Sequence, residues 1–274
     1  MIASSIGMSL MAVIIKYVSQ FPLMEIILFR NIPTLVIIPI ILRKKNIFIY
    51  GNNKPFLLLR AFFGTIGMVT TFYAYTAMPL TEAIAIQQLS PFFIIILSSI
   101  FLHEKLFPYQ IFILLLAFTG GLLVIQPGFR VDIFPALICL FGTIFIAAAH
   151  VTLRYLRLTD HSLVIVNYFA FISSLTGLVI LLKQENLVIP KLENLPILFF
   201  FGFIALFAQT TLTKSYQLAQ ANVVSLYAYF QIVFSGFLSF LIFKELPDLL
   251  SVIGICLIFI SGYLNFKLKL NFEK

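Results

Sequence analysis

The chain reads FYAYTAMPLTEAIAIQQLSPFFIIILSSIFLHEKL from residue 72 to residue 106. Within this stretch, the apolar run 80–102 is long enough to cross a lipid bilayer as a helix. Pro91 lies near the middle of the run, where its missing backbone N–H predicts a kink and a freed carbonyl group. Three polar residues stand just before that proline: Gln87, Gln88 and Ser90.

The composition is that of a membrane protein. Of the 274 residues, 61% are hydrophobic and 10% are charged, whereas soluble globular chains carry about 25% charged residues. The net charge of +8 would suggest a nucleic-acid partner for a soluble protein, but in a membrane protein it marks cytoplasmic loops. Cys139 and Cys256 both lie inside apolar runs, so neither a disulfide nor a metal site is expected. We expect no cofactor and no nucleic-acid partner. The lipid bilayer is the expected environment of the chain.

Pro, Gly, Asn and charged residues divide the chain into ten apolar segments. They cover residues 2–19, 23–42, 55–77, 80–102, 108–126, 133–153, 162–182, 195–217, 221–243 and 248–267. Nearly all reach the length of a membrane-spanning helix. The connections are short, so consecutive helices should be antiparallel neighbours. The sequence therefore predicts an all-α integral membrane protein with ten transmembrane helices. The first segment lacks the basic region and cleavage site of a signal peptide, and we interpret it as the first span.

The distribution of Lys and Arg predicts the orientation of these spans. An even number of spans puts both termini on one side of the membrane. With the termini in the cytoplasm, twelve Lys and Arg fall on the inner side, Arg60 and Arg154 among them, and five fall on the outer side. Since cytoplasmic loops carry the excess of positive charge, we expect both termini to be cytoplasmic. The Ile, Phe, Leu and Lys bias fits an AT-rich bacterial genome, which favours a bacterial inner membrane.

The chain contains an internal repeat. Adding 141 to each residue number aligns residues 75–121 with residues 216–262 without a gap. The alignment pairs Glu104 with Glu245, a match that means more than Phe and Leu matches in so apolar a chain. Five spans per half is an odd number, so the second half would enter the membrane with the opposite orientation. We predict two inverted five-helix repeats, at 1–127 and 128–274, with a site near the midplane between them.

The stretch 72–106 strongly resembles the signature of the EamA branch of the drug/metabolite transporter superfamily. The resemblance rests on an aromatic-Ala pair, a Pro-Leu-x-Glu-Ala start of the fourth span, a central Ser-Pro and a final Leu-x-Glu. The runs MEIILFRN at 24–31 and LLLRAFFGTIGM at 57–68 also resemble it. Within the branch, the chain is similar to the subgroup that contains S-adenosylmethionine uptake transporters. The resemblance implies a ten-helix carrier that works by alternating access.

Arg30 is the first candidate for substrate binding. It lies about seven residues into the second span, where a cation costs on the order of 2.5–3.5 kcal/mol. Its planar guanidinium group suits a substrate carboxylate or phosphate. The alternative is that the side chain reaches toward the interface or holds a neighbouring carbonyl group.

Polar residues at one depth in both halves are further candidates. Gln87, Gln88 and Ser90 of the fourth span correspond under the repeat to Tyr229 and Gln231 of the ninth. A central cavity explains this symmetry better than hydrogen bonds between packed spans, which are the alternative. Asn167 and Gln209, which are polar within the seventh and eighth spans, carry the same two interpretations.

Several tyrosines could supply rings for a cationic or planar ligand: Tyr75, Tyr168, Tyr227 and Tyr229. Because the chain has 11 Tyr and 32 Phe, a structural role is favoured for any single ring. Tyr227 and Tyr229 are the strongest of these candidates because they lie deep in the ninth span. His150 is interpreted as structural.

Glu104 and Glu245 end the fourth and ninth spans, and their repetition predicts a structural role, such as bonding the backbone at the next helix start. No Asp or Glu reaches a predicted midplane. Either ion coupling uses Glu25 or Glu82 in a recessed vestibule, or the protein is an exchanger or facilitator, which is the favoured interpretation.

The function predicted from these patterns is secondary transport of a small polar organic metabolite, with S-adenosylmethionine or a related compound as the first candidate. The alternative is an exporter of amino acids, drugs or other metabolites. An intramembrane enzyme would need a metal-binding motif, paired aspartates or an activated serine, and none is present. A non-transporting scaffold would not need matched polar residues at mid-depth. The sequence is compatible with a monomer and with a homodimer.

Overall fold

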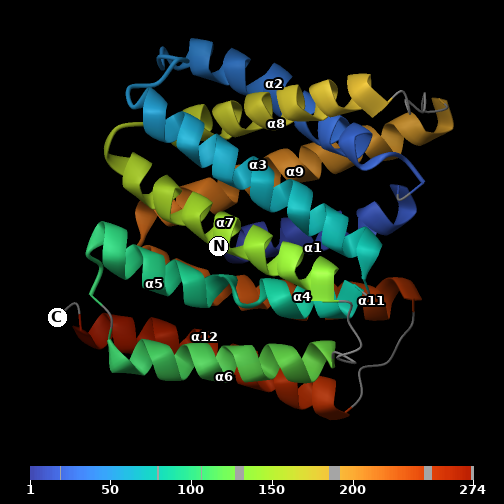
Figure 1. The fold of residues 1–274 in the computed structure, drawn as a ribbon. Coiled ribbons are helices and arrows are strands. Elements are labelled where there is room, and N and C mark those ends of the chain that lie inside the picture. The colour runs from blue at the N-terminus through green and yellow to red at the C-terminus, as the bar shows by residue number, and fades with distance from the viewer. Residues whose placement is uncertain are drawn as a thin grey trace.

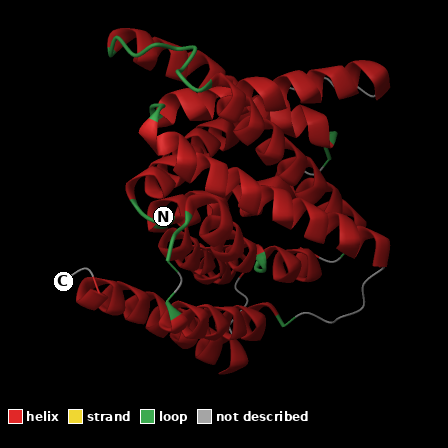
Figure 2. Cartoon of the chain, turned by 60° about the vertical axis from the view of Figure 1, so that its left-hand side comes forward, coloured by secondary structure: helices red, strands yellow, loops and turns green. Residues whose placement is uncertain are grey.

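The computed structural model describes residues 1–18, 20–78, 80–105, 107–126, 133–184, 192–243 and 249–272. Throughout these residues the regular structure is helical, and they contain no strand (Figure 2). The all-α prediction is therefore confirmed for the described part of the chain.

The described residues of the first half form six helices. Their bounds are α1 Ile2–Val18, α2 Leu23–Lys44, α3 Lys54–Ala77, α4 Leu80–Gln87, α5 Ser90–Leu102 and α6 Pro108–Ile125. Prolines lie in the first turn of α3 and α6, where the missing N–H would have no partner in the helix anyway. Helices α5 and α6 end where His103 and Gln126 adopt a left-handed backbone conformation.

The second half follows the same order of helices. Its elements are α7 Ile133–Tyr155, η1 Leu156–Leu158, α8 Ser162–Gln184, η2 Leu192–Asn194, α9 Leu195–Leu218, α10 Ala221–Leu226, η3 Tyr227–Tyr229, α11 Phe230–Phe243 and α12 Leu249–Phe272. Seven helical segments of the described chain are long and apolar enough to span a membrane. Three shorter apolar helices begin at Ile2, Pro108 and Ala221. Ten spans and the positions of the termini remain predictions.

The helices lie side by side in a stack (Figure 1). Helices α2 and α8 pack together at one edge, and α6 and α12 pack together at the opposite edge. Between them, α3 packs on α7 and α8, while α1 packs on α9 and α11. Each of these pairs joins an element of the first half to an element of the second. The interior between the halves is therefore built by both.

Two of the expected spans are interrupted at corresponding places. In the first half, α4 ends at Gln87 and α5 begins at Ser90, immediately before Pro91. In the second half, the 3-10 turn Tyr227–Tyr229 separates α10 from α11 without a proline. A break frees backbone carbonyl groups, which must find partners inside the protein because lipid offers none.

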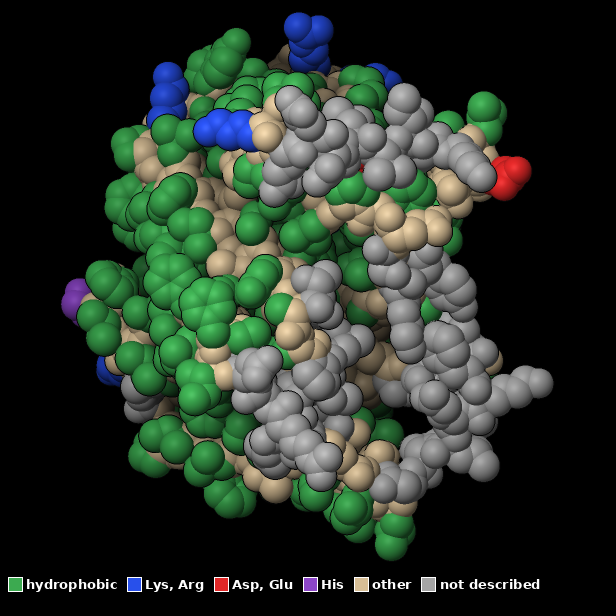
Figure 3. All heavy atoms as spheres, turned by 45° about the vertical axis from the view of Figure 1, so that its right-hand side comes forward, with side chains coloured by type: hydrophobic (Ala, Val, Ile, Leu, Met, Phe, Trp, Pro, Cys, Tyr) green, Lys and Arg blue, Asp and Glu red, His purple; other side chains and the backbone are tan. Residues whose placement is uncertain are grey.

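The outer surface is apolar over large areas. Phe62, Phe101, Phe112, Phe200 and Phe266 are all more than half exposed. On the face shown in Figure 3, hydrophobic side chains dominate, and most of the visible Lys and Arg lie toward the upper edge. A soluble protein rarely exposes so much contiguous apolar surface. This surface fits contact with lipid tails.

Helices α6 and α12 approach closely because each has a glycine at the crossing. A Cβ atom placed on Gly254 would lie 2.5 Å from the carbonyl oxygen of Gly120, and one placed on Gly120 would lie 2.8 Å from that of Gly254. Backbone atoms cannot move aside as the end of a side chain can. The pairing of α6 with α12 therefore depends on small residues, as in many membrane helix pairs.

We predict that Gly254→Ala lowers the thermal unfolding midpoint of the purified protein in detergent, by the equivalent of about 1–3 kcal/mol, because the new methyl group overpacks the crossing. Gly177→Ala in α8 is the matched control, since its Cβ would meet nothing closer than 3.4 Å. Equal midpoints for the two variants would contradict this account of the crossing.

Candidate substrate-binding site

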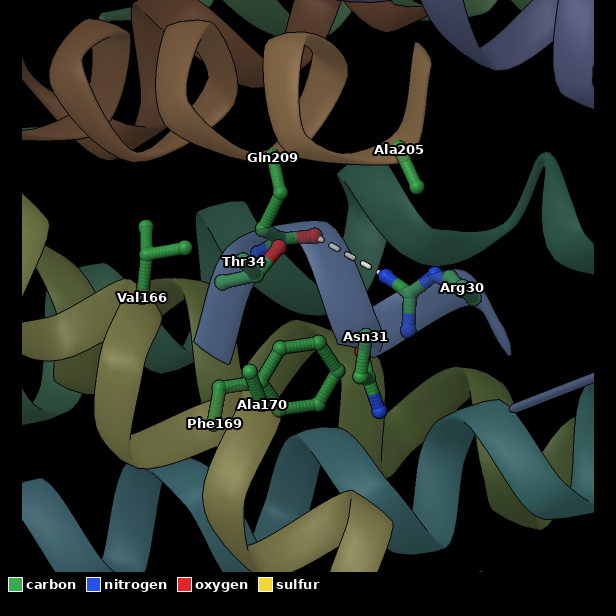
Figure 4. A pocket seen from close by; sticks show the side chains of 8 residues that line it. All are labelled: Arg30, Asn31, Thr34, Val166, Phe169, Ala170, Ala205 and Gln209. Atoms are coloured by element: carbon green, nitrogen blue, oxygen red, sulfur yellow. Dashed lines mark hydrogen bonds between the residues drawn. The ribbon is translucent and has the colours of Figure 1, made fainter. Parts of the chain in front are cut away.

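A narrow polar pocket lies between α2, α8 and α9. Its lining residues are Arg30, Asn31, Thr34, Val166, Phe169, Ala170, Ala205 and Gln209 (Figure 4). Helix α2 comes from the first half of the chain, and α8 and α9 come from the second. The pocket has no room for a water molecule in this conformation. A substrate would therefore need another conformation to enter it.

Arg30 places a buried cation in this pocket. Its side chain is 6% exposed. One terminal nitrogen, Nη2, lies 3.4 Å from Oε1 of Gln209, and the other, Nη1, lies 2.8 Å from the sulfur of Met68. A dashed line in Figure 4 marks the contact between Arg30 and Gln209. The remaining nitrogen, Nε, has no partner within the described residues. Arg30 is thus held by neutral groups and keeps an unused donor.

The opposite side of the pocket is fixed by one hydrogen bond between α2 and α8 and by a second one within α8. Nδ2 of Asn31 donates to Oγ of Ser173 at 2.8 Å, and the Ser173 hydroxyl donates to the carbonyl of Phe169 at 2.6 Å. These bonds hold the backbone of α8 against α2. They fix the position from which the Phe169 ring extends into the pocket (Figure 4).

The ring of Phe169 brings a second arginine to the site. Arg30 Cζ lies 5.2 Å from the ring centroid, and Arg60 Cζ, on α3, lies 4.8 Å from it. Sequence reasoning missed both Phe169 and Arg60: the phenylalanine is one of 32, and the arginine falls among the charges assigned to the inner side. The structure instead buries Arg60, which is 3% exposed. The sequence did contain one indication that Arg60 is buried. It lies about as far into the third span as Arg30 lies into the second.

A polar face of α9 continues away from the pocket. Gln209, Thr213 and Tyr216 follow one another at spacings of four and three residues, so they lie on the same side of the helix. The Tyr216 ring stacks on His150 of α7 at 4.7 Å between centroids. Three buried atoms along this line have no hydrogen-bond partner in the part of the chain that the structure describes: Thr213 Oγ1, Tyr216 Oη and His150 Nδ1. The same holds for the buried Oδ1 of Asn167 on α8.

The polar residues of the fourth and ninth spans meet at the two helix breaks. The Tyr229 hydroxyl donates to the carbonyl of Gln88 at 2.8 Å, and these residues are equivalent under the 141-residue repeat. In an unbroken helix, the backbone N–H of Phe92 would donate to the carbonyl of Gln88. Here it donates to the carbonyl of Leu89 instead, so it does not use the Gln88 carbonyl that the Tyr229 hydroxyl bonds. Of the other candidates here, Gln87, Ser90, Tyr227 and Gln231 are all half-buried.

Helix α1 supplies donors to the second break. Oγ of Ser5 lies 3.4 Å from the carbonyl oxygen of Tyr227. Oγ of Ser9 lies 2.9 Å from the carbonyl oxygens of both Ser5 and Gln231, the latter in the first turn of α11, and its single proton serves one of them at a time. The structure thus joins Gln88 to Tyr229, and Arg30 to Gln209, but these two pairs belong to different sets of helices. None of the break residues lines the pocket of Arg30.

Three further candidates lie away from the pocket or outside the described part of the structure. The Tyr168 hydroxyl donates to the carbonyl of Tyr50, in the connection between α2 and α3, at 2.8 Å. Tyr75 belongs to α3, but its side chain is outside the described part of the structure, and Glu245 lies outside the described residues altogether.

Glu104 has a structural position that links the two halves. Its Oε1 lies 3.3 Å from Nε of Arg154, and its carboxylate accepts the backbone N–H groups of Ala221 and Asn222 at 3.2 and 3.3 Å. The helix start that it bonds is thus α10 of the second half and not α6, the next helix along the chain. The reason is that the end of α5 packs beside α10.

The described helices and their apolar surface define a multi-pass integral membrane protein with a polar interior site. The chain belongs to the EamA-like transporter family, whose model matches residues 1–126 and 133–267.

Known relatives are membrane transporters. The chain is 30% identical to the pseudopaline exporter CntI of Pseudomonas aeruginosa, over 95% of this chain and 92% of that protein. It is 26% identical to solute carrier family 35 member G1 of Homo sapiens, over 88% of this chain and 70% of that protein. A solved structure with 15% sequence identity superposes with a TM-score of 0.87 and covers 99% of this chain and 96% of its own. That likeness concerns the fold.

We predict that Tyr229→Phe lowers the free energy of unfolding by about 1 kcal/mol, because it removes the hydroxyl that bonds a carbonyl freed by a helix break. The change leaves the ring in place. Thermal unfolding in detergent would be compared with Tyr263→Phe on α12, whose ring is 62% exposed. A loss no larger than that of the Tyr263 variant would contradict a role for this bond in joining the breaks.

Proposed function

We propose that this protein is a secondary transporter that moves a small polar organic metabolite across a membrane by alternating access, with Arg30 binding an anionic group of the substrate. The observation that carries the proposal is the burial of Arg30 in a pocket where its partners are the neutral side chains of Gln209 and Met68. A guanidinium group in such surroundings gains most from a carboxylate or phosphate ligand.

The architecture proposed for transport is two inverted five-helix repeats, 1–127 and 128–274, with both termini in the cytoplasm. Two separate family matches, one in each half, support this division. The corresponding breaks before Pro91 and at Tyr227–Tyr229 support it as well. Rocking of the halves would open the pocket first to one side of the membrane and then to the other. Because α2, α8 and α9 of one chain build the pocket, the proposal does not require a homodimer.

Export and import are both candidates for the direction of transport. The name of the Pseudomonas relative favours export. The sequence resemblance to S-adenosylmethionine uptake transporters favours import. A bacterial inner membrane is the proposed location, for which the bacterial relative gives support.

The test is transport of a labelled panel in both directions by cells and by inside-out vesicles that contain the protein. The panel contains S-adenosylmethionine, amino acids, nucleotides and organic acids. We expect saturable transport of at least one compound, reduced about tenfold or more by Arg30→Ala, since a hydrogen bond to a charged group contributes about 1.5–3 kcal/mol.

The control variant is Arg43→Ala, which removes an exposed arginine from the end of the same helix and should transport as the wild type does. Undiminished transport by the Arg30 variant would remove Arg30 from the site. A wild type that moves no compound of the panel in either direction would argue against the transport function itself.

A further inference from the structure

The pocket region holds two buried cations and not one. Arg30 of α2 and Arg60 of α3 both lie over the ring of Phe169, with Cζ atoms 5.2 and 4.8 Å from its centroid. The two Cζ atoms are therefore no more than about 10 Å apart. Gly64 makes room for this arrangement, because a Cβ atom there would collide with Nη1 of Arg60 and with the Phe169 ring.

Neither cation has a negative partner among the described residues. Nε of Arg30 and both Nε and Nη1 of Arg60 are buried there without a hydrogen-bond partner. Arg154 shows what a structural arginine of this protein looks like. It pairs with Glu104 at 3.3 Å and donates to the carbonyl of Gln217 at 2.9 Å.

Two buried arginines without negative partners in the described part of the chain destabilise the ligand-free protein. Each buried cation loses its hydration, and two like charges at this separation repel each other more strongly than they would in water. The face of an aromatic ring attracts a cation by about 0.5–2 kcal/mol, which offsets only part of these costs. A ligand that supplies two negative charges would offset the rest.

We propose that Arg30 and Arg60 together bind a small organic anion that carries two negative groups, with a dicarboxylate as the class that fits. This inference rests on the proposed transport function and names its substrate class. Each guanidinium group binds one carboxylate through its unused donors, and Phe169 keeps the two cations at a fixed spacing. Gln209 orients Arg30 from α9, so ligand binding would connect α2 and α3 to α8 and α9.

The proposal separates substrate candidates by charge. A monocarboxylate leaves one of the two arginines without a counter-charge. S-adenosylmethionine, which carries a sulfonium group beside its amino-acid group, has a net positive charge and would add to the repulsion. A four- or five-carbon dicarboxylate supplies one anionic group for each arginine and is short enough for a site whose two Cζ atoms are no more than about 10 Å apart.

The test is ligand-dependent thermal stability of the purified full chain in detergent, with succinate, glutarate, butyrate and S-adenosylmethionine as probes. In the wild type, we expect succinate or glutarate to raise the unfolding midpoint saturably, with an apparent affinity at least about tenfold above that of butyrate. In Arg60→Gln, the preference for the dicarboxylate should fall to about twofold or less. Arg43→Gln is the control and should keep the wild-type preference.

A second readout separates ligand binding from a structural role of Arg60. Because the charge is uncompensated, Arg60→Gln should leave the midpoint of the ligand-free protein unchanged or higher, whereas loss of a structural arginine would lower it. If the Gln variant fails to fold, the inference of an uncompensated charge is wrong. Arg60→Lys, which keeps the charge and loses the planar fork, should retain part of the preference for dicarboxylates.

Equal stabilisation of the wild type by succinate, glutarate and butyrate, or none by any of them, would overturn the proposal. So would transport of a neutral or cationic compound that needs Arg30 but survives Arg60→Gln. That last result would leave the transport function standing, because it shows a carrier with a different substrate class. Conversely, dicarboxylate binding that depends on Arg60, in a protein that moves no compound, would support the site and count against transport.

Discussion

The hydrocarbon interior of a membrane offers no water, so every backbone polar group inside it must find a partner within the protein. Unbroken helices meet this requirement by themselves. The breaks between α4 and α5 and at Tyr227–Tyr229 do not, and neighbouring side chains complete them. The Tyr229 hydroxyl bonds the carbonyl of Gln88, and the Ser5 hydroxyl of α1 lies 3.4 Å from that of Tyr227. The interior packing of the two halves depends on these contacts.

The same constraint gives meaning to the buried charges. Arg154 is compensated by Glu104 and by carbonyl groups at the end of α9, and so contributes to holding the halves together. Arg30 and Arg60 contact an amide oxygen, a thioether and an aromatic ring, all of them neutral. Two arginines kept in such surroundings are costly for folding alone. This cost, in a chain that belongs to a transporter family, is the basis of the proposal that they bind substrate.

Much of the fold could be predicted from the sequence because lipid imposes simple rules. Apolar length indicated the helices, and Pro91 marked the first break, since proline lacks a backbone N–H. The second break, at Tyr227–Tyr229, contains no proline. It lies beside serine hydroxyls of α1, and the local sequence does not encode a contact with a helix so far away along the chain. Glu104 likewise bonds α10, a helix more than one hundred residues away along the chain.

The site was predictable only in part. Arg30 and Gln209 stood out as polar residues within spans, and the structure brings them together. Phe169 could not be distinguished from the other aromatic residues, because its role arises from where α8 lies against α2 and α3. Tyr168, its neighbour in sequence, faces the Tyr50 connection instead, since adjacent residues point in different directions from a helix.

In a carrier that works by alternating access, the Arg30 pocket opens to each side of the membrane in turn. The most direct measurement is labelling of the Thr34→Cys variant by a membrane-impermeant maleimide in sealed vesicles of each orientation, with Cys139 and Cys256 replaced by serine. The Leu218→Cys variant, at a position that is 84% exposed at the end of α9, serves as the one-sided control. We predict that the Thr34→Cys variant is labelled from both sides of the membrane, while the Leu218→Cys variant is labelled from one. Labelling of the Thr34→Cys variant from one side only, or from neither, would contradict alternating access at this pocket.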